Sequence, residues 1–420
     1  MQRREFLGLL GVGAALGTLP GMARAAASPH PGRVVIVGGG YAGAVAAKYL
    51  RLWGGDPLEI ILVEKSTTFV SCPLSNLVLG GSKAIGDLIF NYSGLDRYRI
   101  KRLHEEVAAV DVGQRRIILP DGDTLPYDRL ILAPGIDFIY DGLPMLQSAE
   151  AQEIVPHAWK AGAQTVNLRK QLQAMPDGGV FVVSIPKAPY RCPPGPYERV
   201  SQAAFYLKNA KPKSKIIVLD ANPEIVSKKG LFTRVWTDLY PGMVDYRPNS
   251  AVVEIDVVAR NVRTEFEMVK ADVLNVIPPQ RAGKIAQQAG LANVDKRWCE
   301  VDFLTYESRL APGVHIIGDS VSAALPKSAH MATSQAKVCA SAIVAAMAGQ
   351  APDPQPVFAN TCYSFVSDKL AMHVANVYRY DPAKKVMLPA DGGGVSDKPS
   401  EQEGNYAQWW AKNIWSDVLT

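Results

Sequence analysis

Three regularly spaced glycines near the start of the chain are the first residues whose pattern predicts chemistry. Gly38-x-Gly40-x-x-Gly43 follows a buried-type strand, residues 33–37, and opens an alanine-rich helix. The next strand ends in an acid, Glu64, about 20 residues after the glycines. In such a βαβ unit the glycines let the backbone approach a pyrophosphate, and the acid binds a ribose hydroxyl. We therefore predict a dinucleotide site rather than a glycine-rich turn without a ligand.

Two later segments favour FAD over NAD in this site. Gly318-Asp319 ends a late apolar strand and resembles the second flavin motif of two-dinucleotide flavoproteins. A helix that follows, with Lys327 just before it, would direct its amino terminus at the flavin ring, where the helix dipole favours an anionic reduced flavin. The turn Ala133-Pro134-Gly135 resembles their other FAD contact, with proline in place of the usual threonine.

A second α/β unit has the layout of an NAD domain without its phosphate cradle. The strand at residues 180–184 leads into a run with five prolines, residues 185–196, where a glycine fingerprint would be needed. Proline has no backbone N–H to donate. We interpret Asp220, at the end of the next strand, as a relic, and we expect no electrons from nicotinamide hydride.

Five cysteines leave at least one outside any internal pair. Cys72 follows Glu64 by eight residues, Cys192 lies in the proline run, and Cys362 follows a proline-rich linker. Cys299 and Cys339 look incidental, and the second of these lies on an apolar helix as a small hydrophobic residue. There is no Cys-x-x-Cys-His, so we predict no covalent haem on this chain, and we predict no metal site.

Several short runs carry a resemblance to a known family. The chain resembles the flavoprotein subunit of flavocytochrome c sulfide dehydrogenase, a relative of sulfide:quinone oxidoreductases. The resemblance extends over the whole chain, and its most specific run is the first of the following: residues 192–199 (Cys-Pro-Pro-Gly-Pro-Tyr-Glu-Arg), 71–76 (Ser-Cys-Pro-Leu-Ser-Asn), 156–162 (Pro-His-Ala-Trp-Lys-Ala-Gly), 362–364 (Cys-Tyr-Ser) and 413–415 (Asn-Ile-Trp).

The resemblance implies roles for five residues. Cys72 would form a thioether to the flavin, and Cys192 and Cys362 a redox disulfide beside it. Glu198 would accept a proton, and Trp410, chosen over two neighbouring tryptophans, would lie near the site. The alternatives are a core thiol for Cys72 and a structural disulfide or two free thiols for the other two cysteines. Glu198 would otherwise be a solvated acid, and Trp410 an ordinary interface tryptophan. The expected FAD-binding residues are Gly38, Gly40, Gly43, Glu64, Lys65, Cys72, Ala133, Gly135, Gly318, Asp319 and Lys327.

The implied activity is oxidation of sulfide to sulfur or polysulfide, with electrons passed singly to a separate c-type cytochrome subunit that carries the haem. The alternatives are an accessory flavoprotein of a sulfur-oxidation system, a sulfide:quinone oxidoreductase and a pyridine-nucleotide-dependent reductase. The last needs the missing second glycine motif, and a quinone reductase needs a membrane-docking carboxyl terminus, whereas residues 406–419 are tryptophan-rich but not basic.

The amino terminus predicts export. Arg3-Arg4-Glu5-Phe6-Leu7, a short apolar run and a small-x-small site resemble a cleaved twin-arginine signal over residues 1–27, with an ordinary secretory signal as the alternative. No later run reaches about 18 apolar residues, so we expect a periplasmic protein without a membrane segment. A net charge of only +5 over 420 residues gives no reason to expect nucleic acid as a partner.

The 48% hydrophobic content excludes a disordered chain, and the length suits about three domains. The predicted fold class is α/β, with two Rossmann-like three-layer domains of the glutathione-reductase kind and a small α+β carboxyl-terminal interface domain. The expected ranges are 28–150 with 280–352 for the FAD domain, 151–279 for the second domain and 353–420 for the last.

Overall fold

Five parallel strands form the first sheet, in the order β19-β9-β1-β2-β5. The computed structural model describes residues 32–420, so the predicted signal peptide lies outside the described residues. The central strands are almost wholly apolar and buried, as a parallel sheet covered on both faces requires. The strands are β1 (Arg33–Val37), β2 (Glu59–Val63), β5 (Lys101–Leu103), β9 (Arg129–Leu132) and β19 (Val314–Ile316).

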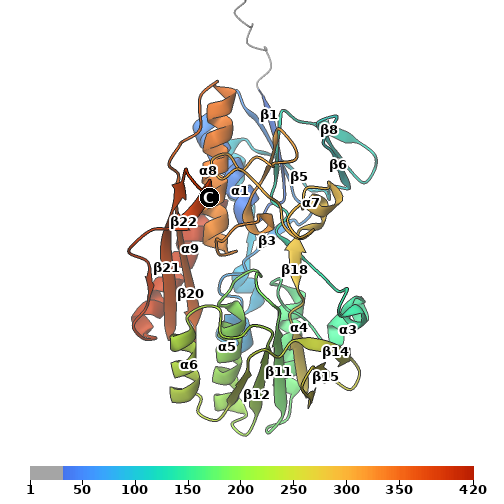
Figure 1. Cartoon of the computed structure of the whole chain (residues 1–420), viewed down its shortest axis with the longest axis vertical. Helices are drawn as coiled ribbons and strands as arrows, with labels where there is room; N and C mark the ends of the chain where they lie inside the picture. Colours follow the sequence, from blue (N-terminus) through green and yellow to red (C-terminus); the bar gives the residue numbers. More distant parts are fainter. Residues whose placement is uncertain (1–31) are drawn as a thin grey trace, which may run out of the picture. The chain divides into compact units, whose positions relative to one another are not determined.

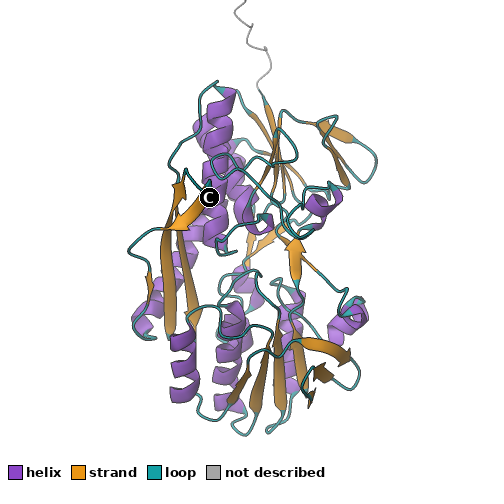
Figure 2. Cartoon of the chain, viewed as in Figure 1, coloured by secondary structure: helices purple, strands orange, loops and turns teal. Residues whose placement is uncertain are grey.

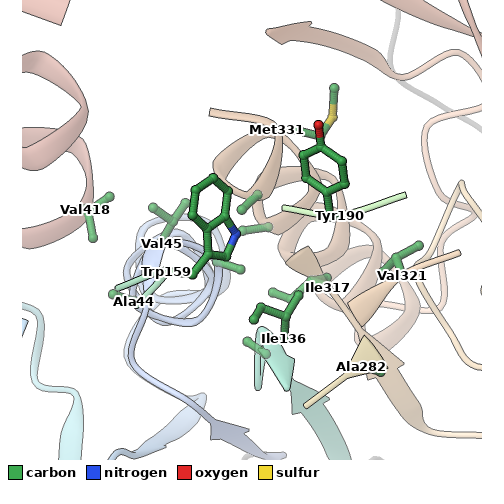
Figure 3. Packing of buried hydrophobic residues seen from close by; sticks show 14 of the residues in the cluster. Ala44, Val45, Ile136, Trp159, Tyr190, Ala282, Ile317, Val321, Met331 and Val418 are labelled. Atoms are coloured by element: carbon green, nitrogen blue, oxygen red, sulfur yellow. The ribbon is translucent and has the colours of Figure 1, made fainter. Parts of the chain in front are cut away.

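Two alanine-rich helices pack along each other beside this sheet, α1 (Tyr41–Gly54) and α8 (Ala329–Met347) (Figure 1). Their small side chains allow close approach, and Ser328 caps α8 by accepting a hydrogen bond from the N–H of Met331 at 3.1 Å. Figure 3 shows part of the buried apolar core around these helices. The packing places the amino termini of both helices at the carboxyl-terminal edge of the sheet.

A second parallel sheet has the order β13-β12-β11-β17. Its strands and flanking helices are β11 (Val180–Ile185), β12 (Lys215–Asp220), β13 (Val244–Arg247), β17 (Val273–Val276), α4 (Ala163–Ala174), α5 (Gly195–Ala210) and α6 (Lys229–Asp238). Helix α5 begins at Gly195, directly after two prolines and with Pro196 in its first turn, because proline is tolerated in a first helical turn. The relic Asp220 is buried, and its carboxylate accepts hydrogen bonds from the hydroxyls of Tyr197 and Tyr246 at 2.8 and 2.9 Å.

Antiparallel strands complete the fold, and Figure 2 separates them from the helices by colour. The pair β10 (Ile136–Phe138) and β18 (Gln280–Ala282) brings the chain back toward the first sheet near residue 280. Three other small sheets are present. One pairs β3 (Thr68–Val70) with β4 (Ile89–Asn91), and a second consists of β6 (Ala109–Asp111), β7 (Arg116–Ile118) and β8 (Thr124–Pro126). The third consists of β14 (Val252–Asp256), β15 (Asn261–Thr264) and β16 (Met268–Lys270).

The carboxyl-terminal segment is an antiparallel sheet with one long helix, α9 (Glu401–Leu419). Its strands are β20 (Val357–Phe365), β21 (Ala371–Asp381), β22 (Val386–Pro389) and β23 (Gly394–Val395). The remaining α-helices within residues 32–420 are short: α2 (Asn76–Gly80), α3 (Ala149–Ile154) and α7 (Lys284–Gln288). Strand β20 contacts both α8 and α5, so this segment touches elements of both parallel-sheet units. Within residues 32–420, no helix combines the length and hydropathy needed to cross a membrane.

The contact of α1 with β1 depends on Gly43, which yields a first prediction. A Cβ at Gly43 would lie 1.8 Å from the carbonyl oxygen of Gly38, whereas a Cβ at Gly40 would meet no heavy atom within 4 Å. Gly43→Ala should lower the free energy of unfolding by about 1–3 kcal/mol, because backbone must move to relieve the overlap. Gly40→Ala is the control and should change it by no more than about 0.5 kcal/mol. Equal denaturant midpoints for the two variants would contradict this reading.

Candidate active site

The glycine fingerprint forms a cradle at the carboxyl-terminal edge of the first sheet. Gly38 has a φ of +101°, and a Cβ there would lie 2.4 Å from the carbonyl oxygen of Ala133. Gly40 has open space on its Cβ side. The Glu64 carboxylate accepts hydrogen bonds from the N–H groups of Gly39 at 2.6 Å and Ser66 at 2.8 Å. The backbone therefore leaves room where a dinucleotide phosphate would lie, with an acid at its edge.

Three adjoining cavities lead from this cradle to the cysteines. The fingerprint cavity, about 420 Å³, is lined by Gly38, Gly40, Glu64, Lys65, Ala133 and Gly135 among others. The middle cavity, about 340 Å³, shares four of these residues and adds Cys72, Gly318 and Asp319. The first two cavities are each of the size of small-molecule sites. The cysteine cavity, about 100 Å³, is lined by Cys72, Cys192, Cys362, Glu198 and Trp410 among others.

Cys72 lies at the junction, since it lines both the middle and the cysteine cavity. Ser328 and Ala329 line both cavities as well, so the amino terminus of α8 faces this junction. Asp319 lines the middle cavity, and burial raises the pKa of its carboxyl against the opposing charges of Arg191 and Lys327. Nine of the eleven predicted flavin-binding residues therefore line connected cavities, all but Gly43 and Lys327, and the residues present fit an FAD.

The ammonium groups of Lys65 and Lys327 both bind other groups of this protein. Lys65 lines the fingerprint cavity and forms an exposed ion pair with Glu106 at 3.1 Å. The Lys327 ammonium donates to the carbonyl oxygens of Asp319 and Val321 at 2.9 and 2.7 Å, and burial lowers its pKa to about 8. Lys327 is not among the residues that line the three cavities, so its predicted contact with the cofactor stays a prediction.

Cys192 and Cys362 come from segments 170 residues apart and line one cavity. Cys192 precedes α5 with a positive φ of 58°, and its N–H donates to the carbonyl oxygen of Lys327 at 2.7 Å. A Cβ on Gly195 would lie 2.9 Å from the Cys192 sulfur and 2.9 Å from the Trp159 ring, so a larger residue there would force one of these side chains to move. Cys362 lies on β20, and the side-chain amide of Asn360 donates to its sulfur at 3.4 Å. All five cysteines are thiols in this structure.

Glu198 is buried on α5, and both carboxylate oxygens accept hydrogen bonds. One accepts from the N–H of Phe365 and the other from the side-chain amide of Asn76, each at 2.9 Å. Burial raises the pKa of Glu198, against these two bonds and the charges of Lys228 and Arg199. A carboxyl with a raised pKa suits proton exchange near neutral pH, and the same bonds also tie three segments together.

Trp410 is the tryptophan of α9 that lines the cysteine cavity. Its ring lies 5.8 Å from that of Tyr363 and 6.2 Å from that of His330, between centroids. Trp409 is 57% exposed, and Trp415 donates its N–H to hydroxyls at the Tyr41 end of α1. The structure therefore brings together Cys72, Cys192, Cys362, Glu198 and Trp410, the five residues to which the resemblance gave roles.

Sequence reasoning missed three polar residues of this site. Asn76 is the last residue of the run 71–76, and Arg191 directly precedes the run 192–199. These positions were the signal by which the two residues could have been predicted. Arg191 lines both the middle and the cysteine cavity, and burial disfavours its charge while Cys72, Asp319 and Cys192 raise its pKa. Lys228 is followed by a second lysine in an ordinary loop, and nothing in the sequence marks it.

Comparison with known families extends this picture. The family described as "Sulfide dehydrogenase (flavocytochrome c) flavoprotein chain, central" matches residues 165–278. "Flavocytochrome c sulphide dehydrogenase, flavin-binding" matches residues 354–419, and "Pyridine nucleotide-disulphide oxidoreductase" matches residues 32–162. A sulfide dehydrogenase flavoprotein chain of Chlorobaculum thiosulfatiphilum is 57% identical over 47 residues, which cover 94% of that sequence and 11% of this chain. This chain belongs to the flavocytochrome c sulfide dehydrogenase flavoprotein family.

Two wider relatives agree with the fold. The mitochondrial sulfide:quinone oxidoreductase of Dictyostelium discoideum is 22% identical over 320 residues, 73% of this chain and 69% of its own. The solved sulfide:quinone oxidoreductase of Aquifex aeolicus matches with a TM-score of 0.73 and 19% identity, over 92% of this chain and 91% of that one. The predictions of the family, of the fold class and of an FAD-binding oxidoreductase are confirmed. The segment predicted as an interface domain, residues 353–420, also contributes Cys362 and Trp410 to the site.

The buried carboxyl of Glu198 yields a prediction about stability and pH. Its pKa is raised on folding, so the folded protein binds this proton more tightly, and the free energy of unfolding should fall as the pH rises from the ordinary carboxyl pKa toward the raised one. Glu198→Gln stays neutral and should flatten this fall at pH values above the ordinary carboxyl pKa of about 4. Glu265→Gln, at an exposed carboxylate, should leave the slope unchanged. Denaturant unfolding over this range is the measurement, and parallel curves for wild type and Glu198→Gln would contradict it.

Proposed function

We propose that this chain is the FAD-bearing subunit of a sulfide dehydrogenase, which oxidises sulfide with a cysteine pair and passes electrons to a c-type cytochrome. One observation carries the proposal: Cys192 and Cys362 share a cavity with Glu198, and Cys72 joins that cavity to the one lined by Asp319 and the glycine cradle. A sulfide-reactive pair and a flavin site are thereby adjacent. When bound, FAD accepts an electron pair and releases single electrons, which is the chemistry that a haem acceptor needs.

In the proposed reaction a hydrosulfide anion attacks one sulfur of a Cys192–Cys362 disulfide. The new S–S bond gives a cysteine persulfide, the old one breaks, and the other cysteine leaves as a thiolate, so that charge and atoms balance. Glu198 holds or accepts a proton beside the pair, and further sulfide releases the persulfide as polysulfide or sulfur. Arg191, at the junction of the cavities, favours the anionic forms of sulfide and thiolate.

The proposed roles of the other residues follow from their positions. Gly38, Gly40 and Glu64 would hold the pyrophosphate and ribose, Gly43 would serve by packing α1 against β1, and Asp319 would hold the ribityl region. Cys72 would carry the flavin through a thioether, which its place at the junction supports. Export through the amino-terminal signal to the periplasm, with cleavage before the mature chain, completes the proposal and is supported by the residues of that signal alone.

The electron acceptor is proposed to dock near α9. Tyr406 and Trp409 are 40% and 57% exposed on this helix, which also supplies Trp410 to the cysteine cavity. Trp53 on α1 is 46% exposed, and α1 contacts α9. Aromatic side chains of this kind are enriched in protein interfaces. A quinone reductase or an accessory flavoprotein would use the same cysteines, and the acceptor that sustains turnover separates these alternatives.

The covalent flavin is tested by acid precipitation. Wild-type protein should give a yellow precipitate, because a thioether survives unfolding, while Cys72→Ser should release its FAD into the supernatant. Cys339→Ala, a buried cysteine on α8 outside the three cavities, should keep the flavin bound. Absorbance of pellet and supernatant is the measurement, and a colourless wild-type pellet would disprove the thioether.

The redox pair is tested by kinetics. Cys192→Ser and Cys362→Ser should each lower sulfide-dependent cytochrome c reduction by at least about a thousandfold, because neither a persulfide nor a leaving thiolate can form without the disulfide. Cys299→Ala should retain wild-type rates, since this buried cysteine lines none of the three cavities. Full activity in either serine variant, with the co-purified cytochrome or a soluble one, would remove the disulfide mechanism.

A further inference from the structure

A buried lysine that the proposed reaction has not used lies directly behind Cys362. Lys228 is 7% exposed, stands immediately before α6 and has a positive φ of 55°. Its ammonium donates to the carbonyl oxygen of Cys362 at 3.0 Å and to the hydroxyl of Ser364 at 2.8 Å. A buried ammonium is costly unless it is paired or fully hydrogen-bonded. Two of its three N–H groups are used in these bonds, which leaves one for a further acceptor.

The register of β20 places this ammonium on the face of the strand that carries the Cys362 sulfur. Residues two apart in a strand direct their side chains to the same face, so Asn360, Cys362 and Ser364 form one polar row. At one end of the row Asn360 donates to the Cys362 sulfur at 3.4 Å, and at the other Ser364 accepts from Lys228. The sulfur of Cys362 therefore lies between an amide donor and the residue that holds the ammonium.

The charges around the two cysteines are unequal. Burial raises the pKa of both thiols, and at Cys362 the ammonium of Lys228 is the largest influence in the opposite direction, followed by the Asn360 bond. At Cys192 the next influences after burial are the negative charges of Cys362 and Glu198, which raise its pKa further. The charges of Arg191 and Lys228 lower the pKa of Cys192 but rank after that of Glu198, whereas at Cys362 the charge of Lys228 ranks ahead of that of Glu198. The positive charge of Lys228 thus has more influence than the negative charge of Glu198 at Cys362, and less at Cys192.

We propose that Lys228 is a positioning residue that makes Cys362, rather than Cys192, the thiolate of the pair. When hydrosulfide attacks the disulfide at the Cys192 sulfur, the S–S bond breaks, Cys192 becomes the persulfide and the negative charge of the hydrosulfide ends on Cys362, opposite the fixed ammonium. The cysteine with the lower pKa is the faster leaving group, so Lys228 directs the attack to Cys192. This assignment deepens the proposed function. It rests on that function only in supposing that the thiolate forms during sulfide oxidation.

The ammonium must stay charged to act in this way. Burial lowers the pKa of Lys228 to about 8, and four neighbouring acidic groups favour its charged form. These groups are Cys362, Glu198, Cys192 and Glu403. A thiolate at Cys362 and an ammonium at Lys228 stabilise each other, because opposite charges interact strongly in a site shielded from water.

The thiolate assignment is tested without sulfide turnover. The full-length flavoprotein is reduced with dithiothreitol and freed of it, then treated with iodoacetamide at several pH values, and alkylation of each cysteine is measured by peptide mass spectrometry. In wild type Cys362 should react at lower pH than Cys192, since the thiolate is the nucleophile. Lys228→Met should slow alkylation of Cys362 at least about tenfold below its pKa, and Lys228→Arg should restore most of the rate because the charge returns.

A second buried lysine provides the matched control. Lys211 also donates its ammonium to backbone carbonyl oxygens, those of Leu172, Gln173 and Met175, but lines none of the three cavities. Lys211→Met should leave the Cys362 pH profile unchanged. If Lys228→Met does not fold, Lys228→Gln keeps a donor for the two oxygen atoms without the charge and should show the same tenfold loss.

Three results would overturn the assignment. They are an unchanged Cys362 profile in the neutral Lys228 variants, equal slowing in Lys228→Arg, and equal slowing in Lys211→Met. Because alkylation needs no sulfide and no acceptor, the assignment is decided independently of whether the chain oxidises sulfide. A single addition of sulfide to the oxidised wild type should in turn place the persulfide on the Cys192 peptide, and a persulfide on the Cys362 peptide would contradict the proposed direction of attack.

Discussion

The carboxylate of Glu198 joins the three parts of the chain that supply the cysteines. Glu198 itself is on α5, six residues after Cys192. Its two oxygens accept from Asn76, four residues after Cys72, and from the N–H of Phe365, three residues after Cys362. A carboxylate taken out of water is strongly destabilised unless its oxygens accept hydrogen bonds, so loss of either of these two bonds would destabilise the folded site. The positions of all three cysteines depend on this one group, and its proposed role in proton transfer rests on the same burial.

Backbone strain gathers around the same cavity. Leu74, Ala158 and Cys192 line the cysteine cavity with positive φ angles, and Lys228, which holds Cys362, has one as well. Side-chain-bearing residues adopt this conformation at a cost of about 1–3 kcal/mol each, and such residues concentrate at functional sites. Hydrogen bonds around these residues offset the cost of the strained backbone. Arg199 donates to the carbonyl oxygens of His157 and Ala158, and the ammonium of Lys228 donates to a carbonyl oxygen of β20. The cavity is therefore held open by elements from the whole described chain.

Much of the fold follows from local pattern. The strand at 33–37, the glycine turn after it, the strand that ends at Glu64 and the helix that follows Lys327 were predicted within a residue or two, because apolar periodicity and turn residues act over short distances. The start of α5 does not follow from local pattern in the same way, since prolines that usually end a helix are tolerated in its first turn. The roles of Cys72, Cys192, Cys362, Glu198 and Trp410 came from the family resemblance, and the structure shows that all five line one cavity.

The sequence alone determined that the chain has a dinucleotide cradle, that its second unit lacks one, and that cysteines stand in distinctive runs, because each of these is a matter of neighbouring residues. Only the tertiary structure decided which distant groups meet. It places Cys192 and Cys362 at one cavity, hydrogen-bonds the Asn76 amide to Glu198, and hydrogen-bonds the Lys228 ammonium to the carbonyl oxygen of Cys362. In sequence Lys228 is an ordinary loop lysine. Folding removes it from water and binds its ammonium to the carbonyl oxygen of Cys362 and the hydroxyl of Ser364, where a charge interacts more strongly than it does in water.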